Sequence, residues 1–125
     1  ENQCVSEYIE RLRIKTPSGN TLIVNLSGGN QQKAILARWL SRKPDIIIME
    51  QPTRGIDVGA KQEIYRIMRD LANEGVSILV ISDEMPELIG LSNRILMMRR
   101  GMITGEIDCK KEVRLNEKHI IQHIT

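Results

Sequence analysis

The feature that most constrains the fold is the apolar run Ile46–Met49, which is followed directly by Glu50 and Gln51. The preceding Lys43-Pro44-Asp45 breaks any helix before it. A continuous β-branched run is typical of a strand buried on both faces of a sheet. At four residues the run is far too short to be a membrane helix, which needs roughly 20. It therefore predicts a strand inside an α/β domain whose sheet is covered by helices.

Helical and extended segments alternate around this strand. Apolar spacing and composition predict helices over 3–13, 31–41 and 58–73, and a short one that Ser82 or Asp83 caps and that ends at Leu91. Further strands are expected over 76–81, also buried, and over 94–98, followed by a hairpin at 101–105. The predicted fold class is α/β, with a largely parallel sheet flanked by helices and right-handed crossovers. The chemistry of such folds lies at the carboxyl ends of the strands.

Composition disfavours several classes of function. The 125 residues carry 18 Lys and Arg against 16 Asp and Glu, and this balance gives no reason to expect a nucleic-acid partner. The chain has no Phe, two Tyr and one Trp, which disfavours base stacking. Cys4 and Cys109 lack the spacing of a zinc ribbon or a disulfide framework. With no signal segment in view, these features predict a soluble domain of a reducing compartment.

The segment Leu26-Ser27-Gly28-Gly29-Asn30-Gln31-Gln32-Lys33 could bind phosphate. A hydroxyl and two glycines at the start of a helix leave backbone N–H groups open to an anion. On local chemistry alone, however, a Gly-Gly pair is more often a turn than a ligand site. A carboxylate and an amide, Glu50 and Gln51, follow at a strand's carboxyl end, where a carboxylate can hold Mg²⁺.

Over about Asn25 to Glu106, the order of these segments resembles the ATP-binding cassette (ABC) ATPases, and this resemblance implies a partial P-loop NTPase fold for the chain. The wording is most similar to the second cassette of the double-cassette subunits of bacterial ribose/galactose/xylose-type sugar importers. Three stretches carry the likeness: the segment above, Pro-Thr-Arg-Gly-Ile-Asp-Val-Gly-Ala-Lys from Pro52, and Ser-Asp-Glu-Met-Pro-Glu-Leu from Ser82.

The resemblance implies roles for particular residues. The signature loop, which touches the γ-phosphate of ATP held by the opposite cassette, would consist of Ser27, Gly28, Gly29 and Gln31. Asp57 would lie in the loop that crosses the dimer interface, although a plain helix N-cap before Val58 is an equally good interpretation that does not exclude this role. Glu50 would hold Mg²⁺ in the intact protein.

The catalytic positions depart from the family pattern. Gln51 stands where the family has a general-base Glu, and an amide cannot accept a proton from water. Ser82 stands where the superfamily commonly has a His that contacts the γ-phosphate, although the sugar-importer second cassettes tend to lack it. No phosphate loop of the pattern Gly-x4-Gly-Lys-Ser/Thr is present, because the most similar stretch, from Gly55 to Lys61, lacks the Gly-Lys pair. Hydrolysis should be slow or nil, and this piece alone should be inactive and hold no ATP tightly.

We therefore expect the C-terminal part of one ABC domain without its phosphate-loop half. Its expected parts are the end of the helical subdomain (1–44), core sheet and helices (45–108) and a C-terminal helix (109–125). His119 and His123 could pair on that last helix, but a solvated face is the favoured interpretation. The strand missing between 76–81 and 94–98 would leave unpaired edges and promote self-association.

The expected partners are a paired cassette, membrane permease subunits and, indirectly, a periplasmic sugar-binding protein. The expected location is cytoplasmic, on the inner face of the membrane, as for a sugar-transporting translocase. Two alternatives stay open: a non-transport cassette ATPase of the DNA-repair or chromosome-organising type, and a regulatory dimerisation module.

Overall fold

The computed structural model describes residues 2–110 and 121. The chain forms two compact units, which divide between Ile81 and Ser82. The segment with His119 and His123, expected to be helical, lies outside the described residues. No helix in the described part of the chain is long and apolar enough to cross a membrane.

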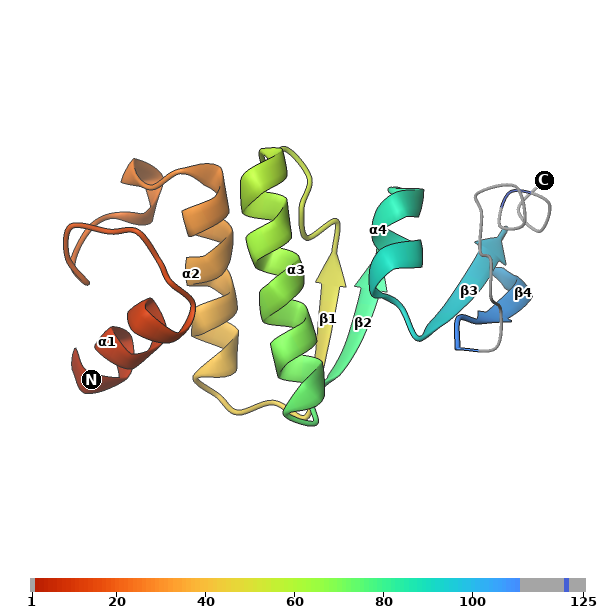
Figure 1. Cartoon of the computed structure of the whole chain (residues 1–125), viewed down its shortest axis with the longest axis horizontal. Helices are drawn as coiled ribbons and strands as arrows, with labels where there is room; N and C mark the ends of the chain where they lie inside the picture. The colour runs from red at the N-terminus through yellow and green to blue at the C-terminus, as the bar shows by residue number, and fades with distance from the viewer. Residues whose placement is uncertain (1, 111–120, 122–125) are drawn as a thin grey trace. The chain divides into compact units, whose positions relative to one another are not determined.

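The first unit contains four helical segments and two strands, in the order predicted except for the short 3-10 helix, which was not predicted (Figure 1). They are α1 (Asn2–Arg11), the short 3-10 helix η1 (Ile23–Asn25), α2 (Gly28–Leu40), β1 (Ile46–Glu50), α3 (Val58–Asn73) and β2 (Ser77–Ile81). The strands β1 and β2 pair in parallel, from Ile46 opposite Ser77 to Glu50 opposite Ile81. The intervening helix α3 makes this parallel pairing possible, because a tight turn cannot join parallel strands.

The core of the first unit is aliphatic, as a chain without Phe requires. The apolar stripe of α3 is buried as predicted, with Ile64 fully inaccessible. It is joined by apolar side chains from the segment after α1, from α2 and from β1, namely Leu12, Ile14, Leu36, Leu40, Ile47 and Met49. Burying each such side chain contributes about 1.5–3 kcal/mol, so this layer dominates the stability of the unit.

One prediction about the strands is wrong: β1 and β2 are covered on one face only. Ile46 and Ile48 are 66% and 65% exposed, and Leu79 and Ile81 are each 50% exposed. Alternate side chains of a strand point to opposite faces, so these four residues share the face opposite the buried Ile47 and Met49. No described segment of the first unit covers that face. We call it the bare sheet face.

The second unit contains α4 (Met85–Leu91) and the antiparallel hairpin of β3 (Arg94–Arg99) and β4 (Met102–Asp108). The turn places Arg100 and Gly101 at φ values of +49° and +77°, as expected of a two-residue hairpin turn. A small core of Ile95, Met97 and Ile107 packs against α4.

The expected cap of α4 needs correction, because the N-cap residue is Glu84 rather than Ser82 or Asp83. The Ser82 hydroxyl instead accepts a hydrogen bond from the Glu84 N–H (3.1 Å), which organises the turn before the helix.

The described strands form two separate sheets, in which β1 pairs with β2 and β3 pairs with β4. Each of the two sheets has only two strands, which is marginal for a sheet in water without further support.

Candidate functional site

The N-terminus of α2 has the features that favour binding of an anion. Ser27 is the N-cap, with extended backbone geometry, and its hydroxyl accepts from the Asn30 N–H at 3.5 Å. Gly28 is exposed, and a Cβ placed there would meet no other atom within 4 Å. The first N–H groups of any helix lack an intrahelical acceptor, and together with the peptide dipoles they give this end roughly half a positive charge.

The Asn30 side chain forms hydrogen bonds to two other residues here, a role that the sequence alone does not predict. Its Nδ2 donates to the Ser27 hydroxyl oxygen at 2.9 Å, and its Oδ1 accepts from the Lys15 N–H at 2.9 Å. The sequence signal is Ser-x-x-Asn at a helix start, a relative of the capping box in which the third helical residue reaches back to the cap.

Gln31 also forms a hydrogen bond within this loop. Its Nε2 donates to the Leu26 carbonyl oxygen at 2.9 Å, and the side chain is partly buried. Gln31 therefore uses its amide donor within the loop, while Ser27 and Gly28 present the exposed surface.

The loop between β1 and α3 is shaped by two left-handed residues, Gln51 (φ +47°) and Gly55 (φ +73°). The Gln51 N–H donates to the Ile81 carbonyl at 2.8 Å and so joins the carboxyl ends of the two strands. Pro52 and Thr53 are fully buried, and their packing restricts the conformation of this loop. Glu50 itself is exposed and Gln51 is half-buried, so both are accessible at the strand end.

Asp57 is the N-cap of α3, and its Oδ1 accepts from the Ala60 N–H at 3.0 Å. The capping interpretation of Asp57 is therefore confirmed. The carboxylate is exposed, so capping leaves its outer edge open to solvent.

The two helix starts touch each other. A Cβ built on Gly29 would lie 2.6 Å from the Ala60 Cβ and 3.8 Å from the Ile56 Cγ2. Real Cβ atoms do not approach so closely, so only glycine fits at residue 29. Figure 1 shows α2 and α3 side by side, with their N-termini at the end of the unit to which β1 and β2 point. Ser27, Glu50, Gln51 and Asp57 are thus all carried on one end of this unit.

An ion pair between a buried lysine and a partly exposed glutamate links the same two helices one turn further along. Lys33 is only 2% exposed, and its Nζ donates to Glu63 Oε2 on α3 and to the Arg13 carbonyl at 3.0 Å. The hydrogen bond from Lys33 holds the pKa of Glu63 below its ordinary value of 4.5. A buried lysine is tolerated only when its ammonium is paired in this way.

Ser82 belongs to the second unit, where its hydroxyl accepts from Glu84 as described above. It directly follows β2 in the chain.

The fit of these residues to Mg²⁺ and ATP is partial. Protein sites for Mg²⁺ commonly use one or two carboxylates together with substrate phosphates and water, and Glu50 can supply one. Among the described residues no group of three or more His, Cys, Asp or Glu could hold a metal by itself. The start of α2 suits a phosphate through its hydroxyl and N–H groups.

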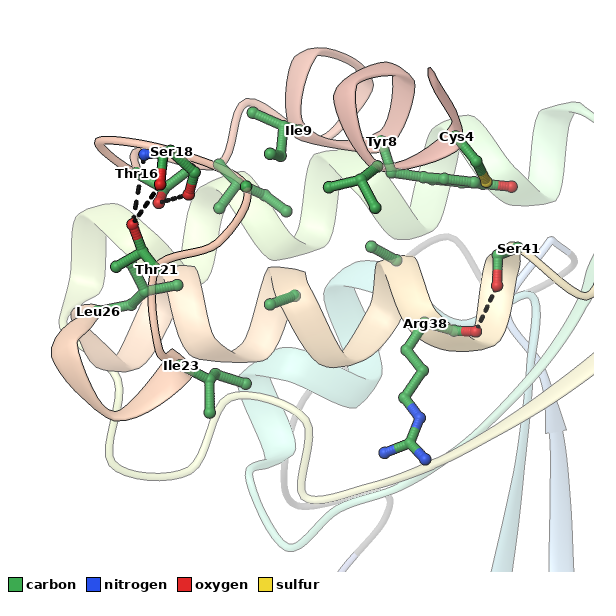
Figure 2. Close-up of a pocket in the computed structure, with 15 residues that line it drawn as sticks. Cys4, Tyr8, Ile9, Thr16, Ser18, Thr21, Ile23, Leu26, Arg38 and Ser41 are labelled. Carbon is green, nitrogen blue, oxygen red and sulfur yellow. Dashed lines mark hydrogen bonds between the residues drawn. The ribbon is translucent and has the colours of Figure 1, made fainter. Parts of the chain in front are cut away.

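A cavity of about 390 Å³ lies elsewhere in this unit, between α1, the 16–26 segment and α2 (Figure 2). Its hydroxyls are already used internally, since Thr16 donates to the Ser18 carbonyl at 2.7 Å and Ser18 and Thr21 bond to each other. Arg38 carries the only charge among the lining residues, and Figure 2 shows it extending away from Tyr8 and Ile9. The cavity is therefore apolar and does not suit a nucleotide.

Comparison with solved structures shows the class to which this fold belongs. An ATP-binding cassette of an ABC transporter matches with a TM-score of 0.79 and 19% identity, over 97% of this chain and 48% of that one. A dimeric bacterial ABC transporter cassette matches with a TM-score of 0.74 and 24% identity, over 86% and 46% respectively. The described fold is thus a partial ABC cassette, as predicted, with one short parallel and one short antiparallel sheet.

Comparison with known sequences places the chain within that class. It is 59% identical over 104 residues to a galactose/methyl galactoside import ATP-binding protein of Clostridium tetani and 51% identical over 107 residues to a ribose import ATP-binding protein of the same organism. It is 54% identical over 102 residues to an arabinose import ATP-binding protein of Pectobacterium atrosepticum. These matches cover 82–86% of this chain.

The chain therefore belongs to the family of ribose, arabinose and galactose importer ATP-binding subunits. It spans about a fifth of the length of the relatives it matches (20–21%). No family model matches it.

Proposed function

We propose that this chain is part of the ATP-binding subunit of a bacterial sugar importer, within its second cassette, and that it supplies the signature loop of a composite ATP site. The observation that carries the proposal is the contact between the starts of α2 and α3 at Gly29 and Ala60. This contact keeps the phosphate-binding end, Ser27 and Gly28, beside the exposed carboxylate loop at Asp57. The names of the relatives, which are sugar-import ATP-binding proteins, support the transport role over the DNA-repair and regulatory alternatives.

In this proposal the N-terminus of α2 binds the γ-phosphate of an ATP molecule held by the opposite cassette. The Ser27 hydroxyl and the Gly28 N–H donate to phosphate oxygens, and the dipole of α2 stabilises the negative charge. The loop at Asp57 lies at the interface between the two cassettes. A dimeric cassette of this class has been described with ADP and Pi, which supports the pairing and the nucleotide.

The site on this cassette itself would turn over slowly. Glu50 contributes a carboxylate to Mg²⁺, but Gln51 has no lone pair basic enough to take a proton from the attacking water. Ser82 lacks the titratable ring of the His that the superfamily commonly has there. This cassette would thus act mainly as the signature-bearing partner of the site whose nucleotide the opposite cassette holds.

The wider assembly follows from the same proposal. Residues 1–44 would be the end of the helical subdomain, 45–108 the core sheet with its helices, and 109–125 a C-terminal helix. The intact subunit would pair two cassettes beneath membrane permease subunits, on the cytoplasmic side, and serve a periplasmic sugar-binding protein indirectly.

The test is Ser27→Ala in the intact ATP-binding subunit, with nucleotide affinities measured by competition against a fluorescent nucleotide. Losing one hydrogen bond to a charged phosphate should weaken ATP binding about tenfold to a hundredfold, with ADP little affected. Ser41→Ala is the matched control, because Ser41 lies at the other end of α2, where its hydroxyl donates to the Arg38 carbonyl. Equal ATP affinity for the two variants would contradict the proposal.

A further inference from the structure

We propose that Asn30 is a positioning residue that commits the Ser27 hydroxyl to donate its proton outward, to an anionic oxygen. This inference rests on the function proposed above and adds a residue to which that proposal gives no part. It follows from the number of hydrogen-bond donors and acceptors that the Asn30 and Ser27 side chains carry.

The orientation of the Asn30 amide is fixed by a group that can only donate. The Lys15 backbone N–H has no lone pair to offer, so the atom of Asn30 that lies 2.9 Å from it is the oxygen, Oδ1. The other end of the amide, Nδ2, then faces the Ser27 hydroxyl at 2.9 Å. The amide nitrogen can only donate, so Ser27 accepts this bond.

The remaining capacity of the Ser27 hydroxyl is then nearly determined. A hydroxyl has two acceptor lone pairs and one proton. One lone pair takes the Asn30 Nδ2–H and the other faces the Asn30 backbone N–H at 3.5 Å. Among the described residues no acceptor is recorded for the proton of Ser27. The proton is therefore left for an acceptor outside this unit.

This arrangement selects the chemistry of the ligand. A group that must accept a hydrogen bond and carry negative charge suits both the outward hydroxyl and the positive end of α2. A terminal phosphate oxygen meets both conditions. The chain Lys15–Asn30–Ser27 thereby connects the polarity of the hydroxyl to backbone that follows α1, outside the signature loop itself.

The experiment measures the ratio of ATP to ADP affinity in the intact ATP-binding subunit. Asn30→Leu is close in shape to the wild-type side chain and removes both hydrogen bonds. Because the Ser27 hydroxyl can then rotate freely, the ratio of ATP to ADP affinity should fall about threefold to tenfold. Asn30→Asp keeps an acceptor for the Lys15 N–H but turns the donor into an acceptor, which captures the Ser27 proton. It should lower the ratio about tenfold to a hundredfold.

The decisive measurement is the double-mutant cycle with Ser27→Ala. If Asn30 acts through Ser27, then Asn30→Leu lowers the ratio no further in the Ser27→Ala background, and Asn30→Asp lowers it further only by the repulsion of its charge. Gln62→Leu, which also replaces a side-chain amide by leucine but at an exposed position on α3, should leave the ratio unchanged.

Three outcomes overturn the inference, and they are distinguishable. An unchanged ratio in Ser27→Ala contradicts both the proposed function and this inference. A lowered ratio in Ser27→Ala together with an unchanged ratio in both Asn30 variants overturns the inference alone. Equal losses from Asn30→Leu with and without Ser27 mean that Asn30 acts independently of the hydroxyl. Partial unfolding does not mimic the expected result, because it lowers ATP and ADP binding together.

Discussion

Replacing Gly29 with Ala should separate the starts of α2 and α3. The added methyl would lie 2.6 Å from the Ala60 Cβ, whereas carbon atoms in contact normally lie about 3.5–4.0 Å apart. The helices must therefore move apart by about 1 Å. Ala60 has no side-chain torsion that could relieve the overlap, so the movement must come from backbone. Overpacking of this kind typically costs about 1–3 kcal/mol.

A matched control is the neighbouring glycine. Gly28→Ala adds the same methyl in the same helical turn, but nothing lies within 4 Å of it. Both substitutions gain helix propensity, worth up to about 1 kcal/mol, so the difference between them isolates the clash. We expect Gly29→Ala to be less stable than Gly28→Ala by about 1–3 kcal/mol.

The assay is native-state hydrogen exchange of the intact subunit, read at the core amides of α2 and α3, because it reports the stability of this region separately from the rest. Ala60→Gly removes the opposing methyl and should restore most of the protection lost in Gly29→Ala. Equal protection in Gly29→Ala and Gly28→Ala, or no recovery in the double variant, would refute the close-contact argument.

Three further predictions follow from the same region. Lys33→Met should make stability fall less steeply with acid: the pKa of Glu63 is lowered by Lys33, so the stabilisation is present above about pH 4.5 and is lost as pH falls through the folded value, which denaturation at several pH values would measure. Gln51→Glu in the intact subunit should raise single-site turnover by about 10² to 10⁴ if a general base is what the site lacks, and unchanged turnover would count against that role. The chain alone should self-associate at tens of micromolar in light scattering, and Ile48→Lys on the bare sheet face should reduce this, whereas a stable wild-type monomer would contradict the expectation.

Local rules predicted much of the fold. The helix Val58–Asn73 was predicted with its N-cap and its buried stripe, because an Asp before an amphipathic run that ends near Gly75 is a strong local signal. The hairpin after Arg94 followed in the same way from its turn residues. The predicted N-cap of α4 was wrong, because Ser82, Asp83 and Glu84 are adjacent. Which of them takes the N-cap position depends on the backbone conformation before the helix.

Two features depend on distant contacts and were beyond local reasoning. A β-branched run indicates a strand, but whether helices cover one face or both depends on which other segments are present, and here Ile46 and Ile48 stay exposed. The burial of Lys33 depends on Glu63, 30 residues away, and lysine is rarely buried. In the candidate site, the positions of Ser27 and Asp57 at helix starts were predictable, whereas the relay through Asn30 required the Lys15 backbone to be seen beside it.

The burial of Lys33 also gives this chain an internal chemical reporter. An amine must be accessible and uncharged to react with an acylating reagent, and the Lys33 ammonium is 2% exposed and bonded to Glu63 and the Arg13 carbonyl. Lys15 and Lys43 are exposed and lack this protection. Modification of Lys33 therefore requires α2 and α3 to part, and its rate relative to the exposed lysines records how often this helix pair opens in the working protein.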